Sequence, residues 1–199
     1  MSTTELKIGP DDNGRAMSLD DFDRAEAEEG FLYELSRGVI AVVDAPQPRH
    51  LAQVDTTREQ FSAYRHAHPG RIFRIAGGAE CKILIAELNS GRHPDLAIYK
   101  SPPPETEDDL WSEWIPEIVI EVVSPSSRHR DYHEKPEEYL RFGVLEYWII
   151  DADKREMLVL KRSRGRWVNY VVRPPDVFQT RLLPGMTFDC GAVFAQAGA

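Results

Sequence analysis

The chain has 199 residues, which suits one domain with a single hydrophobic core. Its composition, 42% hydrophobic and 29% charged, excludes a disordered or fibrous protein. No apolar run approaches the roughly 20 residues of a membrane-spanning helix, and the first residues lack the pattern of a secretion signal. We therefore expect a cytoplasmic protein with no membrane partner. Cys81 and Cys190 are the only cysteines, which excludes a disulfide framework.

The net charge of -9 is unevenly distributed along the chain. Residues 1–30 carry a net charge of -6, whereas residues 154–173 carry a net charge of +6. Clustered Lys and Arg side chains bind polyanions, so the basic segment is a candidate for contact with nucleic-acid phosphates through Arg162, Arg164 and Arg166. The alternative, which is the more common one for a charge run alone, is a solvated basic hairpin.

The start of the chain predicts a head followed by a short helix. Residues 1–17 are acidic and rich in turn residues, which favours a flexible head and places the single domain at residues 18–199. Ser18 and Asp21 fit a capping box before a helix of about ten residues. Further on, apolar residues at near-helical spacing predict a long helix over residues 48–67.

Strands are predicted where β-prone runs lie between turn residues. In the first half of the chain these runs lie at residues 31–36, 39–45, 71–75, 81–88 and 95–99. The proline-rich, acidic segment that follows, residues 101–116, is expected to be an exposed loop.

The second half of the chain predicts a strand, a helix and a second strand. Residues 117–124 (EIVIEVVS) read as a buried central strand, and residues 146–151 (EYWIID) as another. A short helix between them is terminated by Gly143. Such a crossover places both strands in one sheet, in parallel. A closing hairpin over residues 155–173 completes an α/β (α+β) fold with a mixed sheet.

Three acids stand out because they lie in apolar surroundings. Glu121 lies inside the central strand, and an ionised carboxylate there needs a compensating cation, which is either a buried Arg or Lys or a divalent metal. Asp95 begins the neighbouring β-run, so the two carboxylates converge if these strands pair. Two adjacent acids are stable chiefly when they share a cation. Glu34 is a third such acid, on the early strand over residues 31–36.

Several linked motifs resemble a known family. The run IEVVSPSS, preceded by HPDLAIY and followed by EKPEEYLRFGVLEYWIID, is similar to the Uma-type restriction endonucleases, a branch of the PD-(D/E)XK nuclease superfamily. FLYELSRGVI with PQPRH resembles the N-terminal part of that family. The resemblance covers Ser18 to Val172. It implies a restriction-endonuclease-like core and metal-dependent cleavage of DNA.

The resemblance also implies roles for individual residues. Asp95 and Glu121 correspond to the two metal-binding acids, with Mg2+ or Mn2+ as the cofactor, and Glu34 corresponds to an additional acid. The superfamily pattern has a lysine two residues after the second acid, where this chain has Val123. Lys135, on the following helix, stands at the place to which the Uma-type branch has moved this lysine.

The chemistry of phosphodiester hydrolysis suits these residue types. Negative charge grows on the phosphate oxygens and on the leaving oxygen, and divalent ions stabilise both. Lys135 would hydrogen-bond the attacking water or a phosphate oxygen. Because Pro136 is tolerated in a first helical turn, Lys135 is expected near a helix N-terminus, which favours phosphate. The alternative is that Lys135 is one exposed lysine among many.

Two functions of different classes follow from this sequence. The leading hypothesis is a metal-dependent DNA endonuclease with Asp95, Glu121, Lys135 and Glu34 as catalytic residues, acting as a homodimer by analogy with the superfamily. The alternative is a catalytically silent module that keeps the nuclease fold and binds nucleic acid or protein. His50, in PQPRH, lies where the family also tends to have a histidine, and the sequence assigns it no role.

Overall fold

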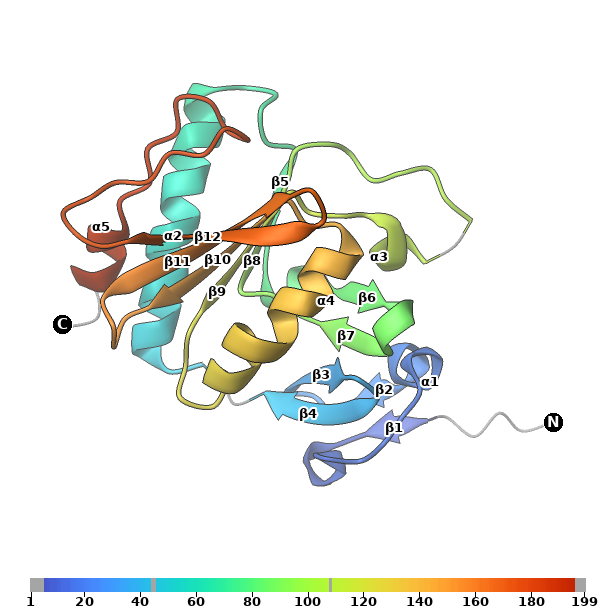
Figure 1. Cartoon of the computed structure of the whole chain (residues 1–199). Helices are drawn as coiled ribbons and strands as arrows, with labels where there is room; N and C mark the ends of the chain where they lie inside the picture. The colour runs from blue at the N-terminus through green and yellow to red at the C-terminus, as the bar shows by residue number, and fades with distance from the viewer. Residues whose placement is uncertain (1–5, 44–45, 108, 196–199) are drawn as a thin grey trace.

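A mixed six-stranded sheet forms the centre of the domain, and a smaller sheet packs beside it (Figure 1). The structure is a computed structural model that describes residues 6–43, 46–107 and 109–195. The strands of the large sheet are β5 (Arg74–Ala76), β8 (Leu96–Tyr99), β9 (Ile118–Val122), β10 (Glu146–Asp151), β11 (Glu156–Ser163) and β12 (Arg166–Val172). The small sheet has β3 (Leu32–Ser36), β4 (Val39–Val43), β6 (Ile83–Ile85) and β7 (Ser90–Arg92). The helices are α1 (Leu19–Arg24), α2 (Pro48–Ala67), α3 (Leu110–Glu113), α4 (Lys135–Phe142) and α5 (Cys190–Ala195).

The large sheet has the strand order β12-β11-β10-β9-β8-β5. Strands β9 and β10 are parallel, with Ile120 opposite Trp148, and the other neighbours are antiparallel. A parallel pair needs a crossover, and α4 supplies it. Gly143 ends this helix with a φ of 113°, a left-handed conformation that glycine adopts without a Cβ clash. The predicted mixed α/β fold, with its crossover and closing hairpin, is confirmed.

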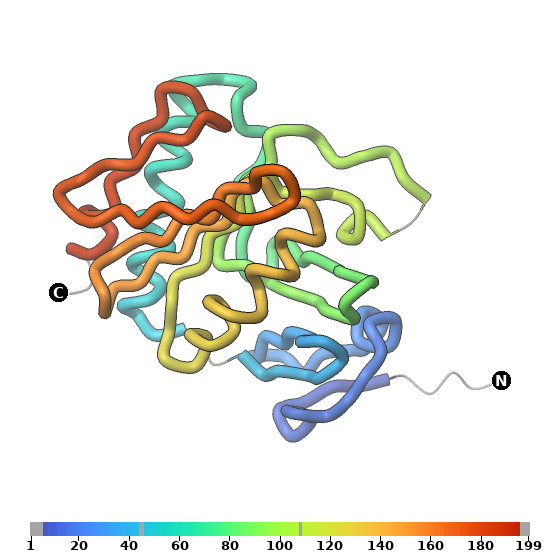
Figure 2. Tube along the Cα trace, in the orientation of Figure 1, coloured from blue at the N-terminus to red at the C-terminus, as the bar shows by residue number. Residues whose placement is uncertain are grey.

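Helices cover both faces of the large sheet (Figure 2). On one face α2 packs over side chains that alternate along the strands, such as Ile118 and Ile120 of β9. On the other face α4 packs Tyr139 against Val119 of β9. This alternation explains why the sequence of β9 is apolar throughout: both of its faces are buried. Glu121 shares the α4 face with Val119, because side chains two apart point the same way.

Aromatic rings hold α2 on the sheet. Phe61 of α2 is fully buried, and its ring centroid lies 5.5 Å from that of Trp148 of β10 and 6.0 Å from that of Phe188. Phe188 belongs to the C-terminal segment, which adds an isolated bridge to Phe178 and then α5. The sequence indicates little pattern there, because its elements are stabilised by contacts with α2 and the sheet rather than by local periodicity.

The N-terminal head is more packed than expected. Lys7–Ile8 forms β1, which pairs in parallel with β2 (Glu26–Ala27), and Ile8 is buried. Ser18 caps α1 as predicted, accepting a hydrogen bond from the Asp21 backbone N–H, although α1 is shorter than ten residues. Residues 1–5 of the expected head, and residues 44–45 of an expected strand, lie outside the described residues.

Two expected regions differ from the structure in detail. Within the predicted strand over residues 81–88, only β6 is extended, and a 3-10 turn over Ala86–Leu88 leads back into β7, which the sequence did not indicate. The residue that ends this turn, Asn89, has a φ of 48° and allows the reversal. The proline-rich loop contains the short helix α3, capped by Asp109.

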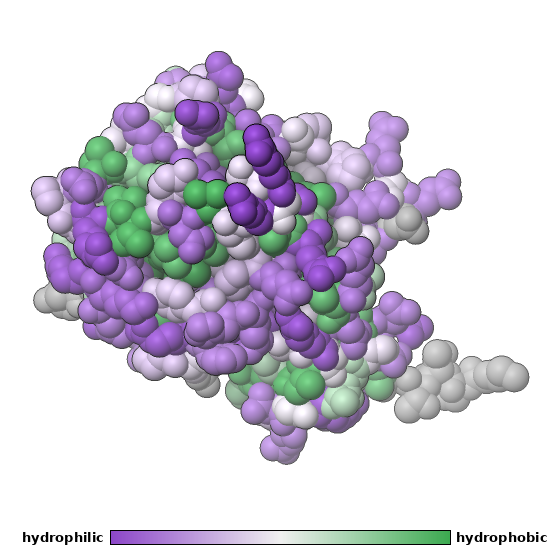
Figure 3. Space-filling view, viewed as in Figure 1, coloured by the Kyte–Doolittle hydropathy of each residue, from purple (hydrophilic) through white to green (hydrophobic). Residues whose placement is uncertain are grey.

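No helix in the described ranges is long and apolar enough to span a bilayer. The face that carries β12 and α4 is mostly hydrophilic, with apolar patches between the polar side chains (Figure 3).

We predict that Phe61→Ala lowers the free energy of unfolding by about 3–5 kcal/mol, because it leaves a cavity between α2, β10 and the C-terminal segment. Leu51→Ala on the same helix is the control, since Leu51 is 45% exposed. Urea unfolding followed by circular dichroism measures both. Equal losses for the two variants would contradict this account of how α2 is held.

Candidate active site

Asp95 and Glu121 lie side by side at one end of the large sheet. Strands β8 and β9 are antiparallel with Leu96 opposite Ile120, so the residue before β8 lies beside the end of β9. The Asp95 backbone N lies 3.4 Å from Glu121 Oε2, and the Val122 backbone N–H donates to Asp95 Oδ2 at 2.7 Å. The structure thus brings together the two predicted metal-binding acids, which are separated by 26 positions in the chain.

A close approach of two backbone segments holds Asp95 in place. A Cβ built on Gly77 would lie 1.9 Å from the Asp95 carbonyl oxygen, so only glycine fits there without a shift. The next residue, Gly78, donates its N–H to the Pro94 carbonyl oxygen at 2.8 Å. The turn that contains these glycines therefore presses against the backbone that presents the carboxylate.

Lys135 is buried at the start of α4 and reaches into the carboxylates. Its Nζ lies 3.0 Å from Glu121 Oε1, 3.0 Å from Asp131 Oδ1 and 3.6 Å from Glu34 Oε1, and the residue is 3% exposed. Burial by itself would lower the pKa of Lys135, but these three carboxylates raise it well above its ordinary value. The alternative that Lys135 is an ordinary exposed lysine is wrong.

Asp131 is a member of this cluster that sequence reasoning missed. It lies in η4 (Arg130–Glu134), a π-helical turn that runs directly into α4, and it is 1% exposed. Ser127 Oγ donates to Asp131 Oδ2 at 2.6 Å, and the Tyr147 hydroxyl donates to the Asp131 backbone oxygen at 2.9 Å. The sequence signal was present in the four-residue spacing from Asp131 to Lys135, which places both side chains on one helix face.

Glu34 connects the cluster to a second buried ion network. Arg92 of β7 is fully buried and donates to Glu34 Oε2 at 3.1 Å and to Glu138 Oε2 at 2.7 Å. Burial would raise the pKa of Glu34, but Lys135, Arg92 and Arg130 together lower it to about 2. Arg92 was missed because β7 itself was not predicted.

Carboxylates outnumber cations in the combined cluster. The acids are Glu34, Asp95, Glu121, Asp131, Glu134 and Glu138; the Arg and Lys residues in contact with them are Arg92, Arg130 and Lys135, and two histidines, His50 and His129, contact Asp95 and Glu134. Burial is the main reason that the pKa of Glu121 rises to about 8; Lys135 opposes the rise, while Asp95, Asp131 and Glu34 add to it. The Tyr139 hydroxyl donates to Glu121 Oε1 at 2.7 Å. Among the described residues, Lys135 is the only cation paired with Glu121, and it contacts Oε1 rather than Oε2.

His50 of α2 also contacts the site, through Asp95. Its Nε2 lies 3.1 Å from Asp95 Oδ1, and the side chain is 17% exposed. Burial would lower the pKa of His50, but the hydrogen bond to Asp95 raises it. The sequence assigned no role to this histidine, and the structure places it against the first predicted metal ligand.

The atoms available to a divalent cation are oxygens of Asp95 and Glu121. Glu121 Oε1 is occupied by Tyr139 and Lys135, whereas Oε2 has only the long contact with the Asp95 backbone N. Among the described residues, no group of three or more His, Cys, Asp or Glu side chains is arranged to hold a metal. Mg2+ commonly uses only one or two protein carboxylates and takes its other ligands from water and substrate phosphates, so this pair fits it.

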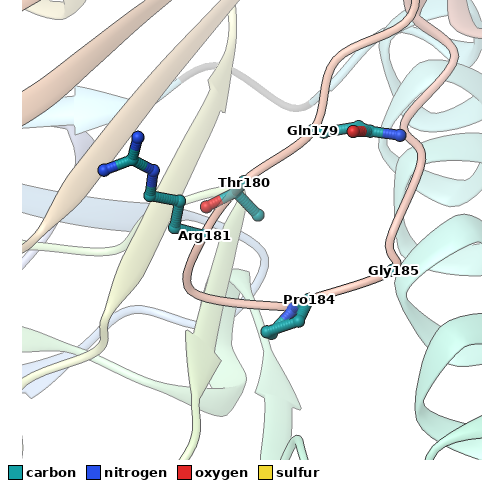
Figure 4. A pocket seen from close by; sticks show the side chains of 5 residues that line it. All are labelled: Gln179, Thr180, Arg181, Pro184 and Gly185. Atoms are coloured by element: carbon teal, nitrogen blue, oxygen red, sulfur yellow. The ribbon is translucent and has the colours of Figure 1, made fainter.

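Two other surface features lie away from these carboxylates. One is the tip of the β11–β12 hairpin, which lies at the C-terminal end of α4: a Cβ on Gly143 would lie 3.6 Å from Arg162 Nη1. Lys135 lies at the opposite end of this helix. A hollow lined by Gln179, Thr180, Arg181, Pro184 and Gly185 belongs to the C-terminal segment (Figure 4). Thr180, which lines this hollow, donates to Glu146 at the start of β10. Glu121 lies near the end of the parallel strand β9, so the hollow and the carboxylates are at opposite ends of the sheet.

Comparisons with known proteins agree with the predicted family. The sequence profile of the Uma2 family, described as "Putative restriction endonuclease", matches residues 19–191. A crystal structure of a putative nuclease from Anabaena variabilis superposes with a TM-score of 0.73 at 19% sequence identity, covering 91% of this chain and 99% of that one. At this identity the likeness shows a shared fold. No curated protein matches the chain.

We predict that Lys135→Met lowers the free energy of unfolding by about 3–5 kcal/mol at pH 7, because it leaves buried carboxylates without their cation. Lys154→Met is the matched control: the Lys154 side chain is 47% exposed and its ion pairs are long, so a change below about 1 kcal/mol is expected. Urea unfolding in the presence of a chelator measures both variants. A loss for Lys135→Met no larger than that of the control would contradict the ion cluster.

A second prediction concerns Glu34 and pH. Because the pKa of Glu34 is lower in the folded chain, its ionised form contributes stability above pH 4.5, and this contribution is lost as the pH falls towards about 2. Glu34→Gln should therefore cost on the order of 3 kcal/mol at pH 7, and the difference from the unchanged protein should shrink below pH 4.5. Urea unfolding from pH 7 to pH 3 tests this, with Glu113→Gln on the exposed side of α3 as the control. A difference that stays constant with pH would refute it.

Proposed function

The chain belongs to the Uma2 family of putative restriction endonucleases, and on this basis we propose that it is a Mg2+- or Mn2+-dependent endonuclease that hydrolyses phosphodiester bonds of DNA. The observation that carries the proposal is the convergence of Asp95 and Glu121 at adjacent strand ends, with a buried lysine 3.0 Å from Glu121. Acids that converge in this way are stable when they share a cation.

The donor set supports a hard divalent cation as cofactor. Asp95 and Glu121 offer carboxylate oxygens, the ligands that Mg2+ and Mn2+ prefer. Because carboxylates outnumber cations around them, a bound divalent cation would compensate part of the negative charge. A bound divalent cation would supply Lewis-acid stabilisation of the charge that develops on the phosphate. Glu121 Oε2 and the Asp95 carboxylate are the groups proposed to hold it.

The remaining residues of the site act on water and substrate in this proposal. Lys135 carries a positive charge in a buried position, where its interaction with a developing oxyanion is stronger than in water. Asp131 and Glu34 hold its ammonium group from two sides. Lys135 is proposed to hydrogen-bond the attacking water or a non-bridging phosphate oxygen. Glu34 acts through Lys135 rather than on the substrate, because Arg92 and Lys135 already engage its carboxylate.

A homodimer and a cytoplasmic location remain predictions of the sequence. Two copies of the site would allow both DNA strands to be cut, which is the reason for expecting a dimer. The proposed role of Arg162, Arg164 and Arg166 in binding phosphates is also untested. The hairpin contacts α4 near Gly143 through Arg162 and at Pro136 through Trp167, so these residues would contact DNA alongside that helix.

We predict that the purified protein nicks supercoiled plasmid in the presence of Mg2+ or Mn2+, and that Asp95→Ala and a chelator each abolish the nicking. The reason is that both remove the cation from the site. Asp55→Ala, at an exposed position of α2, is the control and should cut normally. Agarose gel electrophoresis measures the products.

Cleavage that survives Asp95→Ala would overturn the assigned site. A folded protein that binds DNA without cutting it under either metal would instead support the silent module.

A further inference from the structure

We propose that Arg130 is a phosphate-binding residue of this site, which contacts a backbone phosphate of the bound DNA strand. The inference rests on the proposed function, since it names how the site holds its substrate. It is carried by the position of Arg130 among the three cations that surround Glu34 and by its unused hydrogen-bond donors.

The three cations around Glu34 differ in their exposure to solvent. Arg92, Lys135 and Arg130 lie 3.1, 3.6 and 3.6 Å from a Glu34 oxygen, with side chains that are 0%, 4% and 19% exposed. Arg92 therefore has no contact with solvent, and Lys135 has very little. Arg130 is the most exposed of the three, so a backbone phosphate can approach it from the surface.

The hydrogen-bond donors of the three cations are also used differently. Arg92 donates to Glu34, Glu138, Glu134 and Ser36, and Lys135 is within 3.0 Å of two carboxylates. The Arg130 Nε is buried without a hydrogen bond and faces Glu34 Oε2 at 3.6 Å. Its two Nη groups form no hydrogen bond within the part of the chain that the structure describes, and the side chain is 19% exposed, so these donors are available to a ligand from solvent.

Phosphate is the ligand that suits such a group. A guanidinium offers a planar fork of N–H donors that matches two phosphate oxygens, and these charge-assisted bonds are strong. The cluster around Arg130 carries an excess of carboxylates, which would repel DNA unless a cation lies at its entrance. Arg130 stands at the first residue of η4, next to Asp131, which holds Lys135. A phosphate on Arg130 would therefore lie beside the proposed catalytic lysine.

The test measures DNA binding in a protein that cannot cut. In an Asp95→Ala background, fluorescence anisotropy gives the Kd for a fluorescein-labelled 20-base-pair duplex between 50 and 200 mM NaCl. Arg130→Gln should weaken binding about tenfold and reduce the salt slope of log Kd by about 1, because one phosphate contact is lost. Arg65→Gln, which removes the same charge at an exposed position in the last turn of α2, is the matched control and should change both values less.

Arg130→Lys is the second variant, and it covers the case in which Arg130→Gln fails to fold. It keeps the charge and loses the fork, so it should retain the salt slope and weaken binding. Equal effects of Arg130→Gln and Arg65→Gln, or full affinity in Arg130→Lys, would overturn the inference. If the unchanged protein cuts no DNA but its Asp95→Ala form still depends on Arg130 for binding, the nuclease proposal fails and the phosphate contact stands.

Discussion

The rest of the site depends on the interaction of the buried Lys135 ammonium group with the carboxylates around it. Four carboxylates from different parts of the chain converge near it, and without a cation their mutual repulsion and loss of hydration would be too costly. Three of them lie within 3.6 Å of its Nζ. The fourth, Asp95, contacts Glu121 from the side opposite the lysine. Lys135 therefore compensates Glu34, Glu121 and Asp131, whereas in the described ranges no Lys or Arg side chain pairs with Asp95, which contacts His50.

Rigid elements hold these groups in place. Glu121 lies on a strand paired on both sides, Asp95 is fixed by the Val122 N–H and the turn at Gly77, and Lys135 begins a helix locked in a crossover. The π-helical turn before α4 allows Asp131 to share a face with Lys135. Such turns occur frequently at functional sites. A site built on strands and helix ends in this way holds its charged groups in fixed positions, as the proposed hydrolysis would require.

Local patterns in the sequence were enough to predict the crossover, the long helix over residues 48–67 and the convergence of Asp95 with Glu121. The helix has the predicted bounds: it starts at Pro48, which suits a first helical turn, and its buried residues Gln53, Thr57, Phe61 and Tyr64 recur at helical spacing. Strand β7, Arg92 and the C-terminal elements could not be predicted in this way. They are stabilised by partners distant in the chain: Gly91 pairs with both Leu35 and Leu84, and Phe188 packs against Phe61.

The central claim is the proposal that Asp95 and Glu121 together bind one divalent metal ion. Isothermal titration of the metal-free protein with Mn2+ tests this without requiring any substrate or activity. The account predicts one saturable site per chain, lost in Glu121→Gln and retained in Glu113→Gln. The account would be contradicted if the unchanged protein did not bind Mn2+, or if Glu121→Gln bound Mn2+ as tightly as the unchanged protein.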